Sequence, residues 1–312
     1  MDVSFLSYLV AIIASAGIYA LLALGLNVMW GLTGMVNLGL VGFFAVGGYA
    51  SALVTLRLGL PIPLGLAIAF VLGGASGLVV TLATLRLRGD YLAIVTLGFA
   101  EVVRLIATNE VWLTNGTDGI SQIPGPLRGT LSPFGFNLLF CAIVLAFVAV
   151  AWVLAERLRA SPLGRTLRAI REDDVVASVA GKWVTRFKLQ AFALGAGFMG
   201  VAGALFGHFN SYLSPDHLLP LLTIYIFLAL TVGGTANNLG AVFGAFLVMA
   251  ILEGTRFLAE HVPGLQAVQV AALREMIIGL LLIVVMRVRP TGLFPEKLPR
   301  HRSPAPPQGS QP

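Results

Sequence analysis

The amino-acid sequence predicts an all-α protein that crosses a membrane many times. Hydrophobic residues make up 57% of the chain and charged residues 11%, against about 25% in ordinary soluble domains. Mean hydropathy is +0.91. A bilayer core about 30 Å thick needs roughly 20 apolar residues per helix, and the 312 residues supply many such stretches in succession. We therefore expect one transmembrane domain over 1–299 and no separate soluble domain.

Nine apolar segments follow one another along the chain. The first has no positively charged residue before it and stays apolar through Met29, so we interpret it as a retained helix and not as a cleaved signal. Glycines in the second segment permit a broken or re-entrant helix, which makes the expected count nine or ten spans. The segments are 5–29, 35–56, 61–85, 91–108, 136–155, 189–208, 219–232, 240–257 and 273–288.

Basic residues predict the orientation of these spans. Cytoplasmic loops carry an excess of lysine and arginine, and such residues follow the third, fifth and ninth segments. Strict alternation then places the N-terminus and the loops 109–135 and 209–218 outside, with the C-terminus in the cytoplasm. Residues 300–312 are rich in Pro, Ser and Gln, and we expect them to form a disordered tail.

The loop 156–188 is the one long charged stretch, with eight basic and four acidic residues. Leu163, Leu167 and Ile170 follow the i, i+4, i+7 spacing of one helical face, which predicts a short amphipathic helix. Asp174 would fall on its apolar face, so we expect a break there and a second short piece up to Gly181. The loop either only orients the protein or docks a cytoplasmic partner.

Glycine and polar residues concentrate between 27 and 48. Glycine allows close helix packing, and it also permits unwound backbone beside a water-filled path. Asn27, Thr33 and Asn37 add polar atoms to this stretch, which favours a role in translocation.

Few ionisable residues lie inside the apolar segments, and two pairs have a spacing of three. Glu101 can meet Arg104, and Glu253 can meet Arg256, on one helical face. Each pair either neutralises itself near the outer end of its helix or lines the outer mouth of a pathway for a polar solute.

The sequence offers little for catalysis. Gly181-Lys182 lacks the first glycine of a P-loop and the following Ser or Thr, so this motif does not bind ATP. His208 and His217 have no carboxylate or cysteine at metal-ligand spacing, and Cys141 has no partner. We expect no cofactor and no metal. The net charge is +6, and the basic residues lie between and after the spans. They therefore indicate the orientation of the chain in the membrane and not nucleic-acid binding.

Four ordered motifs resemble the permeases of ABC importers for branched-chain amino acids, of the LivM type. The similarity extends to Arg289-Pro290-Thr291-Gly292-Leu293 and covers about residues 10–294. The motifs are Gly25-Leu26-Asn27 with Gly31-Leu32-Thr33-Gly34 and Asn37-Leu38-Gly39; Arg86 to Phe99; Thr117-Asp118-Gly119; and Ser161-Pro162-Leu163-Gly164-Arg165 leading into Arg168 to Asp174.

The resemblance implies a permease in the inner (cytoplasmic) membrane of a bacterium that moves leucine, isoleucine, valine or related small polar solutes by alternating access. It implies four kinds of partner: a second, LivH-type permease, two cytoplasmic ATPase subunits, a periplasmic or extracellular binding protein, and membrane lipid. ATP hydrolysis belongs to the partner subunits, so this chain is not itself an enzyme.

The resemblance also assigns the candidate site residues. The ATPase-coupling set is Arg165, Arg168, Ala169, Ile170, Arg171, Glu172, Asp173, Asp174 and Gly181. The candidate pathway is Asn27, Gly31, Thr33, Gly34, Asn37, Gly39, Thr96, Gly98 and Glu101, and the outer loop facing the binding protein is Thr117, Asp118 and Gly119. The main alternative is an ion-coupled secondary transporter, which would keep acidic residues near mid-membrane. A channel or membrane scaffold is the third.

Overall fold

The computed structural model describes residues 3–84, 87, 90–261, 267–289 and 291–296. The expected tail at 300–312 and the basic residues Arg86 and Arg88 lie outside these described residues, as does the side chain of Arg256. Within the described part the chain is almost entirely helical, which confirms the predicted fold class.

Each of the nine predicted segments coincides with a long helix in the described part of the chain. The helices are α1 (Val3–Leu26), α2 (Leu40–Arg57), α3 (Ile62–Thr84), α4 (Asp90–Asn109), α6 (Pro133–Ala160), α9 (Val184–Asn210), α10 (Pro220–Gly233), α11 (Asn238–His261) and α12 (Ala267–Val288). In the described part of the chain, six of these helices are long and apolar enough to cross a membrane. They are α1 with the turn that follows it, α2, α3, α4, α6 and α9. The apolar parts of α10 and α11 are shorter. The exact number of spans stays a prediction.

The connection between α1 and α2 is broken, as the glycines of this stretch predict. A π-helical turn, η1 (Asn27–Gly31), follows α1, and residues 34–39 are not helical. Gly34 has φ +74°, a backbone conformation that side-chain-bearing residues rarely adopt. Helix α2 consequently begins at Leu40, five residues after the predicted start at 35.

Two loops at the N-terminal end of the bundle are tied together by a short sheet. The first contains α5 (Val111–Thr114), η2 (Gly116–Asp118) and β1 (Ile120–Ser121), and the second contains β2 (Tyr212–Leu213) and η3 (Pro215–Leu218). Strands β1 and β2 pair antiparallel, with Ile120 opposite Leu213. The backbone of Tyr212 and Leu213, between α9 and α10, thus gains hydrogen-bond partners in the sheet.

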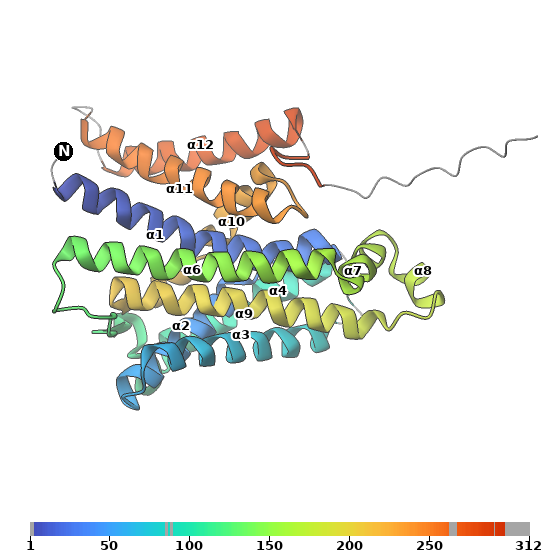
Figure 1. The fold of residues 1–312 in the computed structure, drawn as a ribbon, viewed down its shortest axis with the longest axis horizontal. Helices are drawn as coiled ribbons and strands as arrows, with labels where there is room; N and C mark the ends of the chain where they lie inside the picture. Colours follow the sequence, from blue (N-terminus) through green and yellow to red (C-terminus); the bar gives the residue numbers. More distant parts are fainter. Residues whose placement is uncertain (1–2, 85–86, 88–89, 262–266, 290, 297–312) are drawn as a thin grey trace, which may run out of the picture.

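The charged loop forms two short helices, α7 (Pro162–Glu172) and α8 (Asp174–Val179), beyond the opposite end of the bundle (Figure 1). Ser161 caps α7 by accepting a hydrogen bond from Gly164 N at 3.2 Å, with Pro162 in the first turn. Asp173 is extended and caps α8 through Val175 N at 2.8 Å. The predicted break is confirmed, one residue earlier than expected, because Asp173 is the capping residue.

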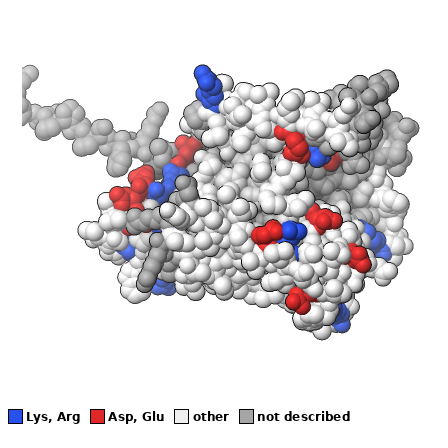
Figure 2. Space-filling model, turned by 180° about the vertical axis from the view of Figure 1, so that it is seen from behind, with Lys and Arg blue, Asp and Glu red and all other residues white. Residues whose placement is uncertain are grey.

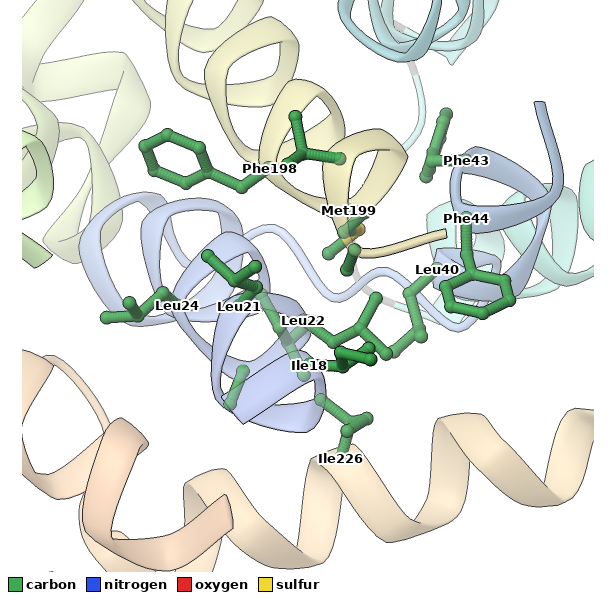
Figure 3. Packing of buried hydrophobic residues seen from close by; sticks show 14 of the residues in the cluster. Ile18, Leu21, Leu22, Leu24, Leu40, Phe43, Phe44, Phe198, Met199 and Ile226 are labelled. Carbon is green, nitrogen blue, oxygen red and sulfur yellow. The ribbon is translucent and has the colours of Figure 1, made fainter. Parts of the chain in front are cut away.

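Helix α1 runs through the centre of the bundle and packs against α6, α9, α10 and α11. Its side chains Ile18 and Leu22 meet Phe44 of α2 and Ile226 of α10 in the buried core (Figure 3). Lipid is as apolar as this core, so close backbone approach and not water exclusion drives much of the packing. A Cβ at position 203 of α9 would collide with the carbonyl of Phe44, which explains why this position is a glycine, Gly203.

Candidate functional site

A buried polar network joins the break after α1 to two distant helices. Asn27 Nδ2 donates to Asn238 Oδ1 at 2.9 Å, and Asn27 Oδ1 accepts from Ala236 N at 2.8 Å. Asn238 Nδ2 in turn donates to Glu156 Oε2 at 2.9 Å, at the end of α6. Since Asn27 and Asn238 are fully buried, these bonds satisfy polar groups that water cannot reach.

The residues after the break form a second packed layer, against α4. Leu38 N donates to Thr96 Oγ1 at 3.0 Å, and Asn37 Oδ1 accepts from Gly39 N at 2.9 Å. A side chain on Gly39 would overlap the carbonyl of Thr96. The predicted pathway residues Asn27, Thr33, Asn37 and Thr96 are thus buried and engaged in packing in this conformation.

Two further predicted pathway residues, Gly98 and Glu101, lie on the uncovered side of α4. Arg104 Nε donates to Glu101 Oε2 at 3.0 Å, so the predicted pair on one helical face is confirmed. Figure 2 shows how rare charges are on this side of the molecule: they gather near the end that carries α7 and α8, and elsewhere form isolated groups on a largely uncharged surface.

A mid-helix polar cluster escaped the sequence analysis. Tyr225 OH donates to Glu275 Oε1 at 2.6 Å, and Arg274 Nη2 lies 3.4 Å from the same oxygen. Nearby on α11, Glu253 accepts a hydrogen bond from Tyr8 OH at 2.8 Å. The adjacent charges Arg274-Glu275 were the available signal, but they stand at the start of the predicted segment 273–288, whereas α12 begins at Ala267 and places them inside the helix.

The predicted coupling residues divide into an inward and an outward group. Arg171 is the clearest inward member: Nη1 donates to the carbonyl of Gly31 at 2.5 Å and Nη2 to Glu296 Oε2 at 2.7 Å. Arg168 Nη1 lies 3.9 Å from Glu296 Oε1, and Asp174 Oδ2 lies 3.2 Å from Lys188 Nζ. Helix α7 is thereby fastened to the broken segment and to the chain after α12.

The outward group forms an exposed surface on α7 and α8. Arg165, Ala169, Glu172, Asp173 and Gly181 are exposed, while Ile170 is buried beside Leu167 as the helical spacing predicts. A hollow of about 490 Å³ lies between the two helices, lined by Arg165, Glu172, Val176 and Lys182 among others.

Three exposed apolar side chains, two on α8 and one immediately before α9, were missed in the sequence analysis. Val176, Val179 and Trp183 are 64%, 84% and 74% exposed. Their signal was their position: they are apolar residues inside a loop that is otherwise charged. Exposed apolar patches mark sites of interaction with proteins or membranes.

The predicted outer-loop residues lie at the end of the bundle away from α7. Tyr212 OH donates to the carbonyl of Asp118 at 3.0 Å, and Gly119, with φ +69°, passes close to the backbone of Leu213 and Ser214. Arg57 Nη2 donates to the carbonyls of Trp112 and Leu113 at 2.5 and 3.0 Å. These contacts hold Thr117, Asp118 and Gly119 in η2 and the residue that follows it.

Together the helices, the broken segment and the projecting α7–α8 unit define a multi-pass membrane protein of the permease class. A family model described as the permease component of branched-chain amino acid transport systems matches residues 8–286, and the chain belongs to this family.

The curated relatives agree. The chain is 33% identical over 305 residues to the high-affinity branched-chain amino acid transport system permease protein LivM of Salmonella typhimurium, covering 91% of this chain and 69% of the relative. Identity to LivM of Escherichia coli is 34% with the same coverage. Identity to the permease protein LivH of Escherichia coli is 26% over 292 residues, 88% of this chain and 91% of the relative. No solved structure gives a significant match.

Proposed function

We propose that this protein is a membrane-spanning subunit of an ATP-driven importer for branched-chain amino acids. The observation that carries the proposal is the family match over residues 8–286 together with the α7–α8 unit, which projects from one end of the bundle and is bonded to the broken segment. The names of the relatives support leucine, isoleucine and valine as substrates.

The projecting unit is the docking element for the ATPase subunits. Its outer surface combines exposed charges at Arg165, Glu172 and Asp173 with exposed apolar side chains at Val179 and Trp183. Apolar area supplies affinity in such contacts, and the charges fix register and partner choice. Arg171, which faces inward, transmits movement of α7 to Gly31.

The remaining partners follow from the same family. A second permease of the LivH type completes a heterodimeric membrane core, which is supported by the similarity of this chain to both LivM and LivH. A binding protein delivers the solute to the loops that contain Thr117 and β2, and two ATPases close on ATP beneath α7. The protein resides in the inner membrane of a bacterium, with α7 in the cytoplasm and the N-terminus outside.

The test is ATP hydrolysis by the purified complex in lipid, with a panel of ligand-loaded binding proteins. Stimulation by a protein loaded with leucine, isoleucine or valine is expected. A double variant, Val179→Ser with Trp183→Ser, should lose most of this stimulation because the ATPases dock poorly. Leu58→Ser, which replaces an exposed apolar residue just after α2 and outside the loops that contain Thr117 and β2, should not. Equal stimulation in both variants would count against the docking surface.

A further inference from the structure

We infer that the second permease subunit packs against one particular side of this bundle, which contains the uncovered face of α4 and the outer face of α12. The inference rests on the proposed function and locates the surface of this chain that meets a LivH-type partner. This side combines glycines that contact nothing in the chain with charged side chains that are exposed near the middle of a helix.

Most glycines of the long helices are explained by close packing inside this chain. A Cβ at Gly47 or Gly203, for example, would collide with the backbone of a neighbouring helix. In the described parts of the long helices, a Cβ meets nothing within 4 Å at three glycines, namely Gly98 of α4, Gly254 of α11 and Gly279 of α12. Glycine weakens a helix relative to alanine, and in membranes small residues mark close contacts between helices. A helix of another subunit would explain these three positions.

On α4 and α12 the open glycine shares a helical face with a carboxylate. Glu101 lies three residues after Gly98, and Glu275 lies four residues before Gly279. Residues three or four apart are neighbours on the surface of a helix. The side chains of Glu101 and Glu275 are 43% and 37% exposed, so this chain covers neither of them completely.

Both carboxylates lie near the middle of their helices and not at the ends. Glu101 is one residue past the centre of the span Tyr91–Asn109, and Glu275 lies within three residues of the centre of α12. Exposure of charged groups to lipid at such a position is costly. Pairing with Arg104 and Arg274 reduces this cost without removing it, since Nε of Arg274 has no hydrogen-bond partner among the described residues.

The exposed faces of α3 and α6 show how a lipid-facing surface of this chain is composed. Val71 of α3 and Val150 of α6 are 63% and 58% exposed. The sequence contains no charged residue from 62 to 84 or from 133 to 155, which covers all of α3 and most of α6. Exposed charges near the middle of a helix therefore distinguish α4 and α12 from the helices that suit lipid.

Helices α4 and α12 belong to one connected side of the bundle. Helix α4 packs against η3, and Asp216 of η3 lines the same partly open hollow as Tyr225 of α10. Tyr225 OH in turn donates to Glu275 of α12 at 2.6 Å. In Figure 1 α4 lies behind α6 and α9, and the view from behind in Figure 2 shows small mixed groups of acidic and basic side chains on an otherwise uncharged surface. A single partner can therefore contact both helices.

A second permease is the occupant that fits this surface. The chain is similar to both LivM and LivH of Escherichia coli, each named as a permease protein of a high-affinity branched-chain amino acid transport system. Related subunits can pair about a pseudo-two-fold axis through the same face of each. Such a partner brings helices of similar length and polar groups at the same depth, which the hydrocarbon of the bilayer lacks.

The first test is photo-crosslinking in the complete importer complex, with an epitope tag on the LivH-type subunit. The photoreactive residue p-benzoylphenylalanine replaces either Val102 or Val71. Val102 is 54% exposed and lies four residues after Gly98 on α4, whereas Val71 is 63% exposed near the middle of α3. We expect a tagged adduct with the combined mass of the two permeases from position 102 and none above background from position 71.

A second pair of variants measures assembly directly. Gly98→Leu fills the space that a helix of the partner would occupy, and this subunit should still fold because a Cβ there meets nothing within 4 Å. The matched control is Ala75→Leu, which enlarges an exposed small residue on α3. We expect Gly98→Leu to reduce the amount of LivH-type subunit that co-purifies with this chain about tenfold, and Ala75→Leu to leave it within about twofold.

The outcomes separate this inference from the proposed function. If the wild-type complex contains both permeases and imports leucine with ATP, while position 102 gives no tagged adduct and Gly98→Leu assembles normally, the inference is overturned and the proposed function stands. An adduct between two copies of this chain from position 102 would also overturn it, because the occupant is then a second copy. If no second permease co-purifies and leucine uptake does not require ATP, both are overturned.

Discussion

The guanidinium of Arg171 bonds to the carbonyl of Gly31 at 2.5 Å, across 140 positions of sequence. Gly31 ends the π-helical turn after α1, and Arg171 lies in the last turn of α7. The same guanidinium holds Glu296 at 2.7 Å, so one side chain connects the projecting helices, the broken segment and the chain after α12. A rigid connection of this kind is what movement of α7 needs in order to reach the interior of the bundle.

Replacing Arg171 should therefore uncouple ATP hydrolysis from transport. Lysine keeps the charge but has no planar fork, so Arg171→Lys cannot hold Gly31 and Glu296 together. Each charge-assisted bond contributes about 1.5–3 kcal/mol, and loss of one should reduce uptake roughly tenfold while ATP hydrolysis continues. The measurement is the ratio of ATP hydrolysed to leucine imported, with Arg165→Lys on the exposed side of α7 as the matched control. An unchanged ratio in Arg171→Lys would contradict the coupling role.

Substitution in the buried amide network should destabilise the bundle. Asn27→Leu removes the acceptor for Ala236 N and the donor to Asn238, leaving buried polar groups unsatisfied at a cost of about 1–3 kcal/mol each. We expect a lower melting temperature in nanodiscs. The control, Asn210→Leu, removes only an exposed bond within α9 and should melt like wild type. Equal melting temperatures for the two variants would show that the network contributes little.

The contact between Gly39 and Thr96 should tolerate no side chain. In Gly39→Ala the added Cβ would overlap the backbone carbonyl of Thr96. This carbonyl cannot rotate away as a flexible side chain could. Loss of folded protein, read as the monodisperse fraction in gel filtration, is expected. Gly98→Ala is the control, because a Cβ there meets nothing within 4 Å and alanine favours the helix by about 1 kcal/mol. A well-folded Gly39→Ala protein would show that α2 and α4 separate readily.

Much of the architecture was predictable because it depends on local pattern. Hydropathy located all nine long helices, and the spacing of Leu163, Leu167 and Ile170 located α7. The inward direction of Arg168 and Arg171 was not predictable, since it depends on Glu296, more than a hundred residues away. The hydrogen bond between Asn27 and Asn238 was likewise not predictable, because nothing in the sequence around either residue indicates a contact at that separation.

Acid should loosen the loop that contains His217. Burial lowers the pKa of His217 below its usual value of about 6.5, while Asp216 opposes this in part. The folded loop favours the neutral ring, so its full stability is present above pH 6.5 and declines as pH falls from there through the lowered folded value. Hydrogen exchange of residues 211–218 at pH 7.5 and 5.5 measures the effect. It should be faster at pH 5.5 in wild type, and a His217→Gln protein should lose this difference. Equal change in both proteins would assign the acid sensitivity to other groups.

The most direct test of the account is leucine uptake into proteoliposomes that contain the complete complex, with its loaded binding protein outside and ATP inside. The account predicts uptake that requires ATP, persists when ionophores abolish proton and sodium gradients, and falls about tenfold in Arg171→Lys. Uptake that follows an ion gradient and proceeds equally without ATP would contradict it and identify a secondary transporter.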